Sequence, residues 1–187
     1  MIKRRDCLQQ PIFFPCSVPM QKQREYLAHL RQNVKSFLES IPFDPSKRYL
    51  EIGPSLQYDS YCKQHPSIET LDIDPSLGCT YTYDLTNDVP FKEDFDVILC
   101  CEILEHTRNP FLVIENIRKS LKPSGFVYIS SPFNFRLHGP LPDCFRISEC
   151  GYASLLKDFE IVSLDCIYDE EVPYFPIHYT CVAKKIN

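Results

Sequence analysis

Four predicted strands each end close to an acidic side chain that could bind a polar ligand. Glu51 lies near the end of RYLEI, Asp72 near the end of IETLDI, Asp84 after TYTY, and Glu102 after FDVILCC. In an open parallel sheet, ligands bind beyond the carboxyl ends of the strands. A carboxylate after the second strand can accept both hydroxyl hydrogens of a ribose, and one on the next loop can accept from an adenine amine. The four acids therefore favour a nucleoside site over the alternative that each only caps a helix or turn.

The loop after the first predicted strand, GPSLQY, indicates which class of nucleoside cofactor could bind there. Cofactors that carry phosphates need several glycines, so that backbone N–H groups can approach the phosphate oxygens. The chain has five glycines, and only Gly53 lies in this loop. A cofactor with a ribose, an adenine and an amino-acid tail needs less of the loop, and Ser55 could receive the tail. We therefore predict S-adenosylmethionine as the cofactor. A nicotinamide-dependent oxidoreductase remains an alternative on the strand pattern alone.

Helical and strand-like segments alternate along the rest of the chain. Apolar residues recur at three- and four-residue steps over 21–41, which predicts an amphipathic helix ended by Pro42. The following continuous apolar strands, separated by helical segments, predict an α/β fold with a mostly parallel sheet covered on both faces. The last two predicted strands, 159–168 and 178–185, have no helix between them. We expect them to form an antiparallel pair at one edge of the sheet.

We expect one domain over residues 1–187. Its parts are an N-terminal arm (1–20), the helix at 21–41 and an α/β core (47–187). Three prolines in the arm oppose regular structure, and its apolar residues indicate that it packs on something. The arm is either a strap over the core or a lid over a substrate pocket.

Five segments, in order, resemble one known family. YLEIGPS, IETLDIDPS, YTYDLTN, FDVILCCEILEHTRNP and LKPSGFVYISSPF lie within about residues 47–135. Together they are similar to the motifs of class I S-adenosylmethionine-dependent methyltransferases. The resemblance implies a Rossmann-like fold, with a seven-stranded mostly parallel sheet whose last strand is antiparallel and with helices on both faces.

The resemblance also implies roles for nine residues. Glu51 would orient the loop and the methionine end of the cofactor, which Gly53 and Ser55 would line. The loop departs from the usual family pattern at Ser55 and Gln57, where small residues are common. The remaining roles are as follows: Asp72 would hold the ribose hydroxyls, Ile73, Asp84 and Leu85 would contact the adenine, and Cys101 and Glu102 would lie beneath the sulfonium.

The candidate catalytic residues follow the fourth and fifth predicted strands. Methyl transfer to a hydroxyl requires alignment and a base. The loop SSPFNFRLHGPLPDCFRIS is similar to a loop of some small-molecule and glycan methyltransferases, and it contains His138, Asp143 and Arg146. We predict His138 as the general base, since an unperturbed imidazole has a pKa near ~6.5; the alternative is a loop histidine bonded to backbone. His106 is a second candidate. Asp143 either assists catalysis or pairs with Arg146 to hold the loop.

Composition excludes several other classes of function. A net charge of −5 disfavours a nucleic-acid surface, and no apolar run is long enough to span a membrane. Ten cysteines occur without a CxxC pair, so we expect no metal centre. The sequence shows no secretory signal, so we expect reduced thiols and a cytoplasmic protein. The predicted function is O-methylation of a small polar acceptor such as a sugar or glycan hydroxyl. The alternative is a methyltransferase-like binding or regulatory module without turnover.

Overall fold

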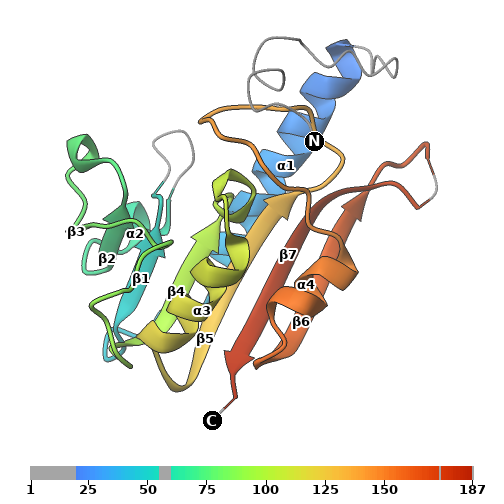
Figure 1. Cartoon of the computed structure of the whole chain (residues 1–187). Coiled ribbons are helices and arrows are strands. Elements are labelled where there is room, and N and C mark those ends of the chain that lie inside the picture. The colour runs from blue at the N-terminus through green and yellow to red at the C-terminus, as the bar shows by residue number, and fades with distance from the viewer. Residues whose placement is uncertain (1–19, 55–59, 173, 187) are drawn as a thin grey trace, which may run out of the picture.

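A seven-stranded mixed sheet forms the centre of the computed structural model, which describes residues 20–54, 60–172 and 174–186 (Figure 1). The N-terminal arm and Ser55 lie outside these residues. The strands are β1 (Tyr49–Ile52), β2 (Glu69–Asp72), β3 (Tyr81–Thr82), β4 (Phe95–Cys101), β5 (Leu121–Pro132), β6 (Phe159–Tyr168) and β7 (Pro176–Lys185). The helices are α1 (Met20–Glu39), α2 (Tyr61–Gln64), α3 (Pro110–Ser120) and α4 (Glu149–Leu155), with 3-10 turns η1 (Pro75–Leu77) and η2 (Leu104–His106).

The strand order is β3-β2-β1-β4-β5-β7-β6. Strands β1 to β5 pair in parallel, whereas β7 runs antiparallel to both β5 and β6. The predicted sheet and its antiparallel last pair are therefore confirmed. The chain leaves β1 toward β2 on one side and returns to β4 on the other, so the order reverses between β1 and β4. Ligands of such sheets bind at this reversal.

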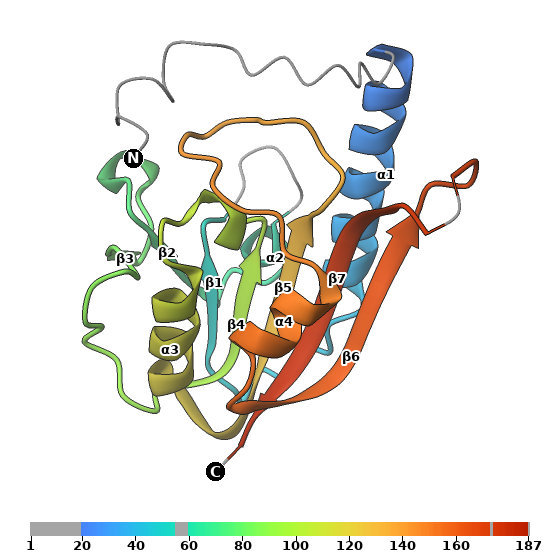
Figure 2. The ribbon, with the colours of Figure 1, turned by 45° about the vertical axis from the view of Figure 1, so that its right-hand side comes forward.

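Helices cover both faces of the sheet. Helix α1 lies on one face, and α3 and α4 lie on the other (Figures 1 and 2). The side chains of β4 alternate between these layers: Val97 and Leu99 pack with α1, whereas Ile98 and Cys100 pack with α3. Because both faces of β4 are covered, both sets of side chains must be apolar. This explains the unbroken apolar segment at 97–101.

The helix ends follow local sequence. Asn109 accepts a hydrogen bond from the Leu112 N–H at the start of α3, next to Pro110. Ser148 caps α4 in the same way through the Gly151 N–H. Helix α1 ends at Glu39, slightly earlier than the expected 41. The two N-caps fix where the loops at the carboxyl edge of the sheet end.

One long loop covers the carboxyl edge of the parallel strands. It leaves β5, arches over the strand ends and returns to α4, as Figure 2 shows. Among the described residues, no helix has the length and apolar character needed to cross a bilayer. The eight cysteines in the described ranges are free thiols.

Candidate functional site

A cavity of about 630 Å³ opens at the carboxyl edge of the sheet. It lies over the ends of β1, β2 and β4 and beneath the long loop, where the strand order reverses. Eight of the nine predicted cofactor residues line it: Glu51, Gly53, Asp72, Ile73, Asp84, Leu85, Cys101 and Glu102. The ninth, Ser55, lies outside the described residues.

Gly53 makes the sharp turn at the end of β1. Its φ of +59° is in the left-handed region, which side chains other than glycine enter at a cost. A Cβ at this position would lie 2.2 Å from Cδ1 of Ile103. The Gly53 N–H also donates to the carbonyl of Leu71, at 2.8 Å. The single glycine of this loop is therefore required by backbone conformation and by the close approach of Ile103.

Glu51 is buried and holds the start of α2. One carboxylate oxygen accepts from the N–H of Tyr61 at 3.0 Å, and the other accepts from the N–H of Cys62 at 2.7 Å. Both oxygens therefore satisfy backbone donors at the first turn of a helix, where a negative charge is favourable. The expected contact with the methionine end of the cofactor stays a prediction.

Asp72 and Asp84 each use one oxygen in a turn. Oδ1 of Asp72 accepts from the N–H of Asp74 at 2.8 Å, and Oδ1 of Asp84 accepts from the N–H and hydroxyl of Thr86 at 2.8 and 2.7 Å. Oδ2 of Asp72 is turned toward Gly53, 3.9 Å from where a Cβ would stand. Both residues therefore cap a turn, which was the alternative to a nucleoside site. In Asp72 the turn uses only Oδ1, so Oδ2 is not engaged in it.

Apolar side chains flank these acids in the cavity. Ile73 is 64% exposed, an unusual position for an isoleucine, while Leu85 is buried. An exposed apolar side chain beside a carboxylate suits an adenine nucleoside, because the base can pack on the side chain while the ribose hydroxyls bind the carboxylate. Cys101 lies deeper, and burial raises the pKa of its thiol, so the group facing the cavity is neutral at physiological pH.

Glu102 stands at the end of β4 with a φ of +57°. Its Oε1 accepts from the hydroxyl of Ser130 and from Nε2 of His178, each at 2.8 Å. Asn33 of α1 donates to the other ring nitrogen of His178, which leaves Nε2 to carry the proton. Burial alone would raise the pKa of Glu102, but the neighbouring His178 and Ser130 outweigh it and lower that pKa. Sequence patterns did not connect His178 with Glu102, because the two residues meet only through the sheet.

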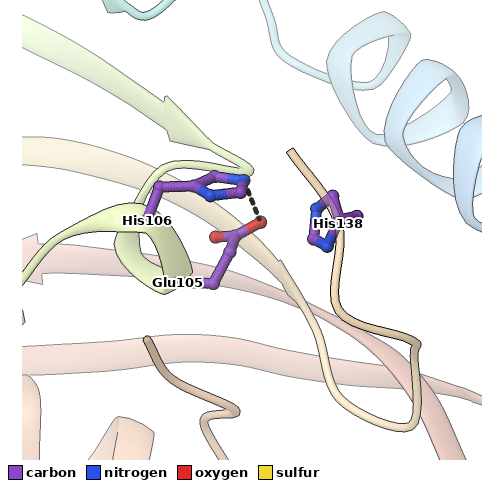
Figure 3. Close-up of side chains that lie close together, drawn as sticks. All are labelled: Glu105, His106 and His138. Atoms are coloured by element: carbon purple, nitrogen blue, oxygen red, sulfur yellow. Dashed lines mark ion pairs between the residues drawn. The ribbon is translucent and has the colours of Figure 1, made fainter. Parts of the chain in front are cut away.

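Glu105, His106 and His138 form a second polar group beside the cavity (Figure 3). Each offers one ligand atom, and these atoms lie within 4.8 Å of one another. Glu105 is fully buried, and neither of its carboxylate oxygens has a hydrogen-bond partner in the described part of the chain. Burial, and then the negative charge of Glu102, raise the pKa of Glu105 well above its usual range. Spacing along the sequence does not indicate this cluster.

Asp143 lies behind His138 rather than in the cavity. Its side chain is 1% exposed, and it accepts from the backbone N–H of His138 at 2.9 Å and from Arg146 at 2.8 Å. Burial opposes ionisation, but the hydrogen bonds of Arg146 lower the pKa of Asp143 to about 2. The carboxylate does not line the cavity; it pairs with Arg146, as the alternative in the sequence held, and is placed to position His138. A direct catalytic role of Asp143 stays a prediction.

Comparison with known proteins decides the family. A family model described as a methyltransferase domain matches residues 20–179, most of the chain. This chain is a methyltransferase domain. Its class uses S-adenosylmethionine and has the Rossmann-like fold, so the resemblance identified from the five sequence segments is confirmed.

Curated relatives of the methyltransferase domain match short segments. A protein of Haemophilus ducreyi named ubiquinone biosynthesis O-methyltransferase is 44% identical over 69 residues, which are 37% of this chain and 29% of that protein. A protein of Histophilus somni with the same name is 44% identical over 41 residues, which are 22% and 17% of the two chains. The chain thus spans less than a third of the length of these relatives.

Solved structures resemble the methyltransferase domain over most of its length. An S-adenosylmethionine-dependent methyltransferase of Mesorhizobium loti superposes with a TM-score of 0.62 at 12% identity, covering 80% of this chain and 96% of that one. The N-methyltransferase NodS of Bradyrhizobium japonicum gives 0.56 at 15%, covering 89% and 99%. The [4+2]-cyclase SpnF gives 0.57 at 14%, covering 83% and 80%. Since a cyclase shares it, the fold alone does not fix the reaction.

Proposed function

We propose that this methyltransferase domain transfers a methyl group from S-adenosylmethionine to a hydroxyl of a small polar acceptor, a sugar or glycan hydroxyl being the preferred class. The observation that carries the proposal is the pair of imidazoles, His106 and His138, that line the cofactor cavity. The acceptor oxygen attacks the methyl carbon, and the carbon–sulfur bond breaks with its electron pair on sulfur. The products are a methyl ether and S-adenosylhomocysteine, and the hydroxyl proton is lost.

His138 is placed to promote the loss of that proton. Its Nδ1 lies 3.1 Å from Oδ2 of Asp143, an ionised carboxylate that accepts the Nδ1 proton. Nε2 is then the unprotonated nitrogen, as a general base requires. Burial, opposed by Asp143, lowers the pKa of His138, which keeps the ring neutral near pH 7. The expected role of general base is the simplest use of this nitrogen.

The predicted cofactor residues supply the other half of the site. Asp72 and Asp84 would hold the ribose and adenine, with Ile73 and Leu85 against the base. Glu102, at the end of β4, would lie beneath the sulfonium. In this arrangement the acceptor enters between the cofactor and the long loop, where His138 lies.

Two further observations support a small oxygen acceptor. The curated relatives are named as O-methyltransferases, although the similarity covers only part of them. The net charge of −5 disfavours binding to a phosphate backbone. The choice of a sugar or glycan as the acceptor class rests on the loop that carries His138.

The test combines cofactor binding with transfer. Calorimetry with S-adenosylmethionine and S-adenosylhomocysteine should give one binding event per chain, and labelled cofactor should transfer its methyl to one member of a panel of sugars and phenols. His138→Ala should lower turnover about 10²–10⁴-fold while cofactor affinity is retained, and exposed His29→Ala is the matched control. Absence of heat with both ligands would refute the proposal. Binding without transfer to any acceptor would instead support the non-catalytic module.

A further inference from the structure

We infer that Glu105, His106 and His138 bind one divalent first-row transition cation, such as Zn²⁺ or Mn²⁺, at the edge of the cofactor cavity. Two imidazole nitrogens and one carboxylate oxygen are borderline donors that these cations accept readily. Mg²⁺ prefers an all-oxygen shell, so this set does not favour it. Figure 3 shows the Glu105 carboxylate pointing toward the two rings.

Glu105 provides the first independent argument. A buried carboxylate is normally satisfied by hydrogen bonds or an opposite charge, because its desolvation is otherwise costly. Both oxygens of Glu105 lack a hydrogen-bond partner within the described residues, although its side chain is fully buried. Arg146, a cation of the long loop, is hydrogen-bonded to Asp143 instead. A bound divalent cation would supply the missing charge and ligand bonds.

The two histidines provide the second argument, because both expose the same nitrogen. Nδ1 of His106 lies 3.0 Å from the carbonyl oxygen of Pro142, and Nδ1 of His138 lies 3.1 Å from Oδ2 of Asp143. In the neutral form of each ring Nδ1 therefore carries the proton, and Nε2 keeps its lone pair. An oxygen acceptor behind one nitrogen, with the other nitrogen free, is the usual arrangement of metal-binding histidines.

The backbone holds the two halves of the site together. Glu105 and His106 lie on the turn η2 directly after β4, and His138 lies on the long loop after β5. The N–H groups of Cys144 and Phe145 in that loop both donate to the carbonyl of Glu105, at 2.6 and 3.2 Å. The loop is thus tied to the turn that carries the other two ligands.

The distances suit a site that tightens around a cation. Ligand atoms about 2.0–2.2 Å from a metal lie roughly 3–4 Å from one another. The three atoms are now within 4.8 Å, so a movement of about 1 Å would complete the shell. Three protein ligands leave at least one position open, as catalytic rather than structural sites do.

The open position gives the cation a role, and this part rests on the proposed function. An acceptor hydroxyl bound to the cation is a stronger acid, so its proton passes to solvent water as the oxygen attacks the methyl carbon. His138 would then act as a ligand instead of a free base. A vicinal diol, as in a sugar, could bind through two neighbouring oxygens and present one of them to the sulfonium.

Direct binding tests the site without requiring the reaction. The full chain is stripped with a chelator and titrated with Co²⁺ by visible absorbance and with Zn²⁺ by calorimetry, with Mg²⁺ for comparison. We expect one Co²⁺ or Zn²⁺ per chain and an affinity at least about 100-fold lower in Glu105→Gln and in His138→Ala. Glu115→Gln, an exposed change of the same kind on α3, should bind like the native protein. Thermal unfolding of each variant separates loss of a ligand from loss of the fold, and His138 is the safer variant because it lies partly exposed on a loop.

The outcomes separate the cation site from the methyl transfer. Absence of a cation-dependent absorption band in the native protein, or equal affinity in native protein and both variants, would overturn the site. Binding of the cation together with failure of methyl transfer would contradict the proposed function and leave the site standing. Transfer that persists after complete chelation would overturn the catalytic role of the cation.

Discussion

His178 on β7 donates a hydrogen bond through Nε2 to Glu102 at the end of β4, over 2.8 Å. The two strands are not neighbours, since β5 lies between them, and Ser130 of β5 donates to the same oxygen. The antiparallel edge of the sheet therefore reaches the floor of the cofactor cavity. His178 was predicted only as part of the antiparallel pair at the sheet edge, yet it holds Glu102, which was predicted to lie at the cofactor.

Replacement of His178 tests this link. His178→Phe leaves the buried carboxylate of Glu102 with Ser130 alone, and breaking a buried pair from one side costs roughly 3 kcal/mol of unfolding free energy. Urea unfolding measures the loss. Asn33→Ala, which removes only the outer hydrogen bond to the ring, should cost about 1 kcal/mol. Equal stability of native protein and His178→Phe would contradict a structural role for the pair.

Asp72 tests the ribose site. Its Oδ2 is turned toward the Gly53 loop, and loss of a charge-assisted hydrogen bond to a ligand costs about 1.5–3 kcal/mol. Asp72→Ala should therefore weaken S-adenosylhomocysteine binding about 10- to 100-fold by calorimetry. Asp74→Asn, an exposed acid that caps η1 next to it, is the control and should bind normally. Unchanged affinity in Asp72→Ala would place the ribose elsewhere.

Gly53 and Gly78 form a matched pair for the turn after β1. Both have positive φ, but an added Cβ meets Ile103 at Gly53 and nothing within 4 Å at Gly78. Gly78→Ala should show backbone strain alone, about 1 kcal/mol, whereas Gly53→Ala adds the collision with Ile103 and should also reduce cofactor affinity. Thermal unfolding and calorimetry report the two effects. Similar behaviour of both variants would argue against the importance of the close approach.

Arg146 tests whether the long loop must be held rigidly. Its guanidinium donates to the carbonyls of Phe135 and Arg136 and to the carboxylate of Asp143. Lysine cannot reproduce this planar set of donors. Arg146→Lys should lower turnover about 10- to 100-fold through misplacement of His138, with cofactor affinity nearly unchanged. Arg118→Lys on α3 is the control. A parallel loss of cofactor affinity would show a wider collapse of the site.

Asp169 predicts how stability depends on acid. It is buried beside Tyr26 and Lys22 of α1, and hydrogen bonds, first from Tyr26, lower its pKa to about 2. A depressed pKa in the folded state stabilises the protein above the unfolded value near ~3.9, and the contribution is lost as the pH falls toward 2. Asp169→Asn should therefore flatten the decline of stability between about pH 4 and pH 2. Exposed Asp158→Asn should leave that decline intact when both are measured by urea unfolding.

Local pattern was enough to predict which acids gather at one edge of the sheet. The strands are short apolar segments bounded by turns, and their carboxyl ends meet at one edge whichever helices connect them. Glu51, Asp72, Asp84 and Glu102 therefore had to gather there, and the structure places all four on the cavity. The lone glycine was equally informative, since a positive φ is a local requirement.

The clustering of Glu105, His106 and His138 could not be predicted from local pattern. His106 and His138 are 32 positions apart, and their rings are brought to 4.8 Å only because the long loop is hydrogen-bonded to the turn after β4. Burial of Glu105 depends on the same packing, since its neighbour in sequence, His106, is partly exposed. The order of residues along the chain does not indicate that the long loop packs on the turn after β4.

The sequence by itself determined the α/β order, the acids at the strand ends and a cofactor without phosphates. These follow from periodicity, strand direction and backbone conformation, which act over a few residues. Only the tertiary structure decided the pairing of His178 with Glu102, the position of Asp143 behind His138 and, within the described residues, the lack of a hydrogen-bond partner for the Glu105 carboxylate. Each of these depends on long-range packing, which decides the burial and the partners of a charged group.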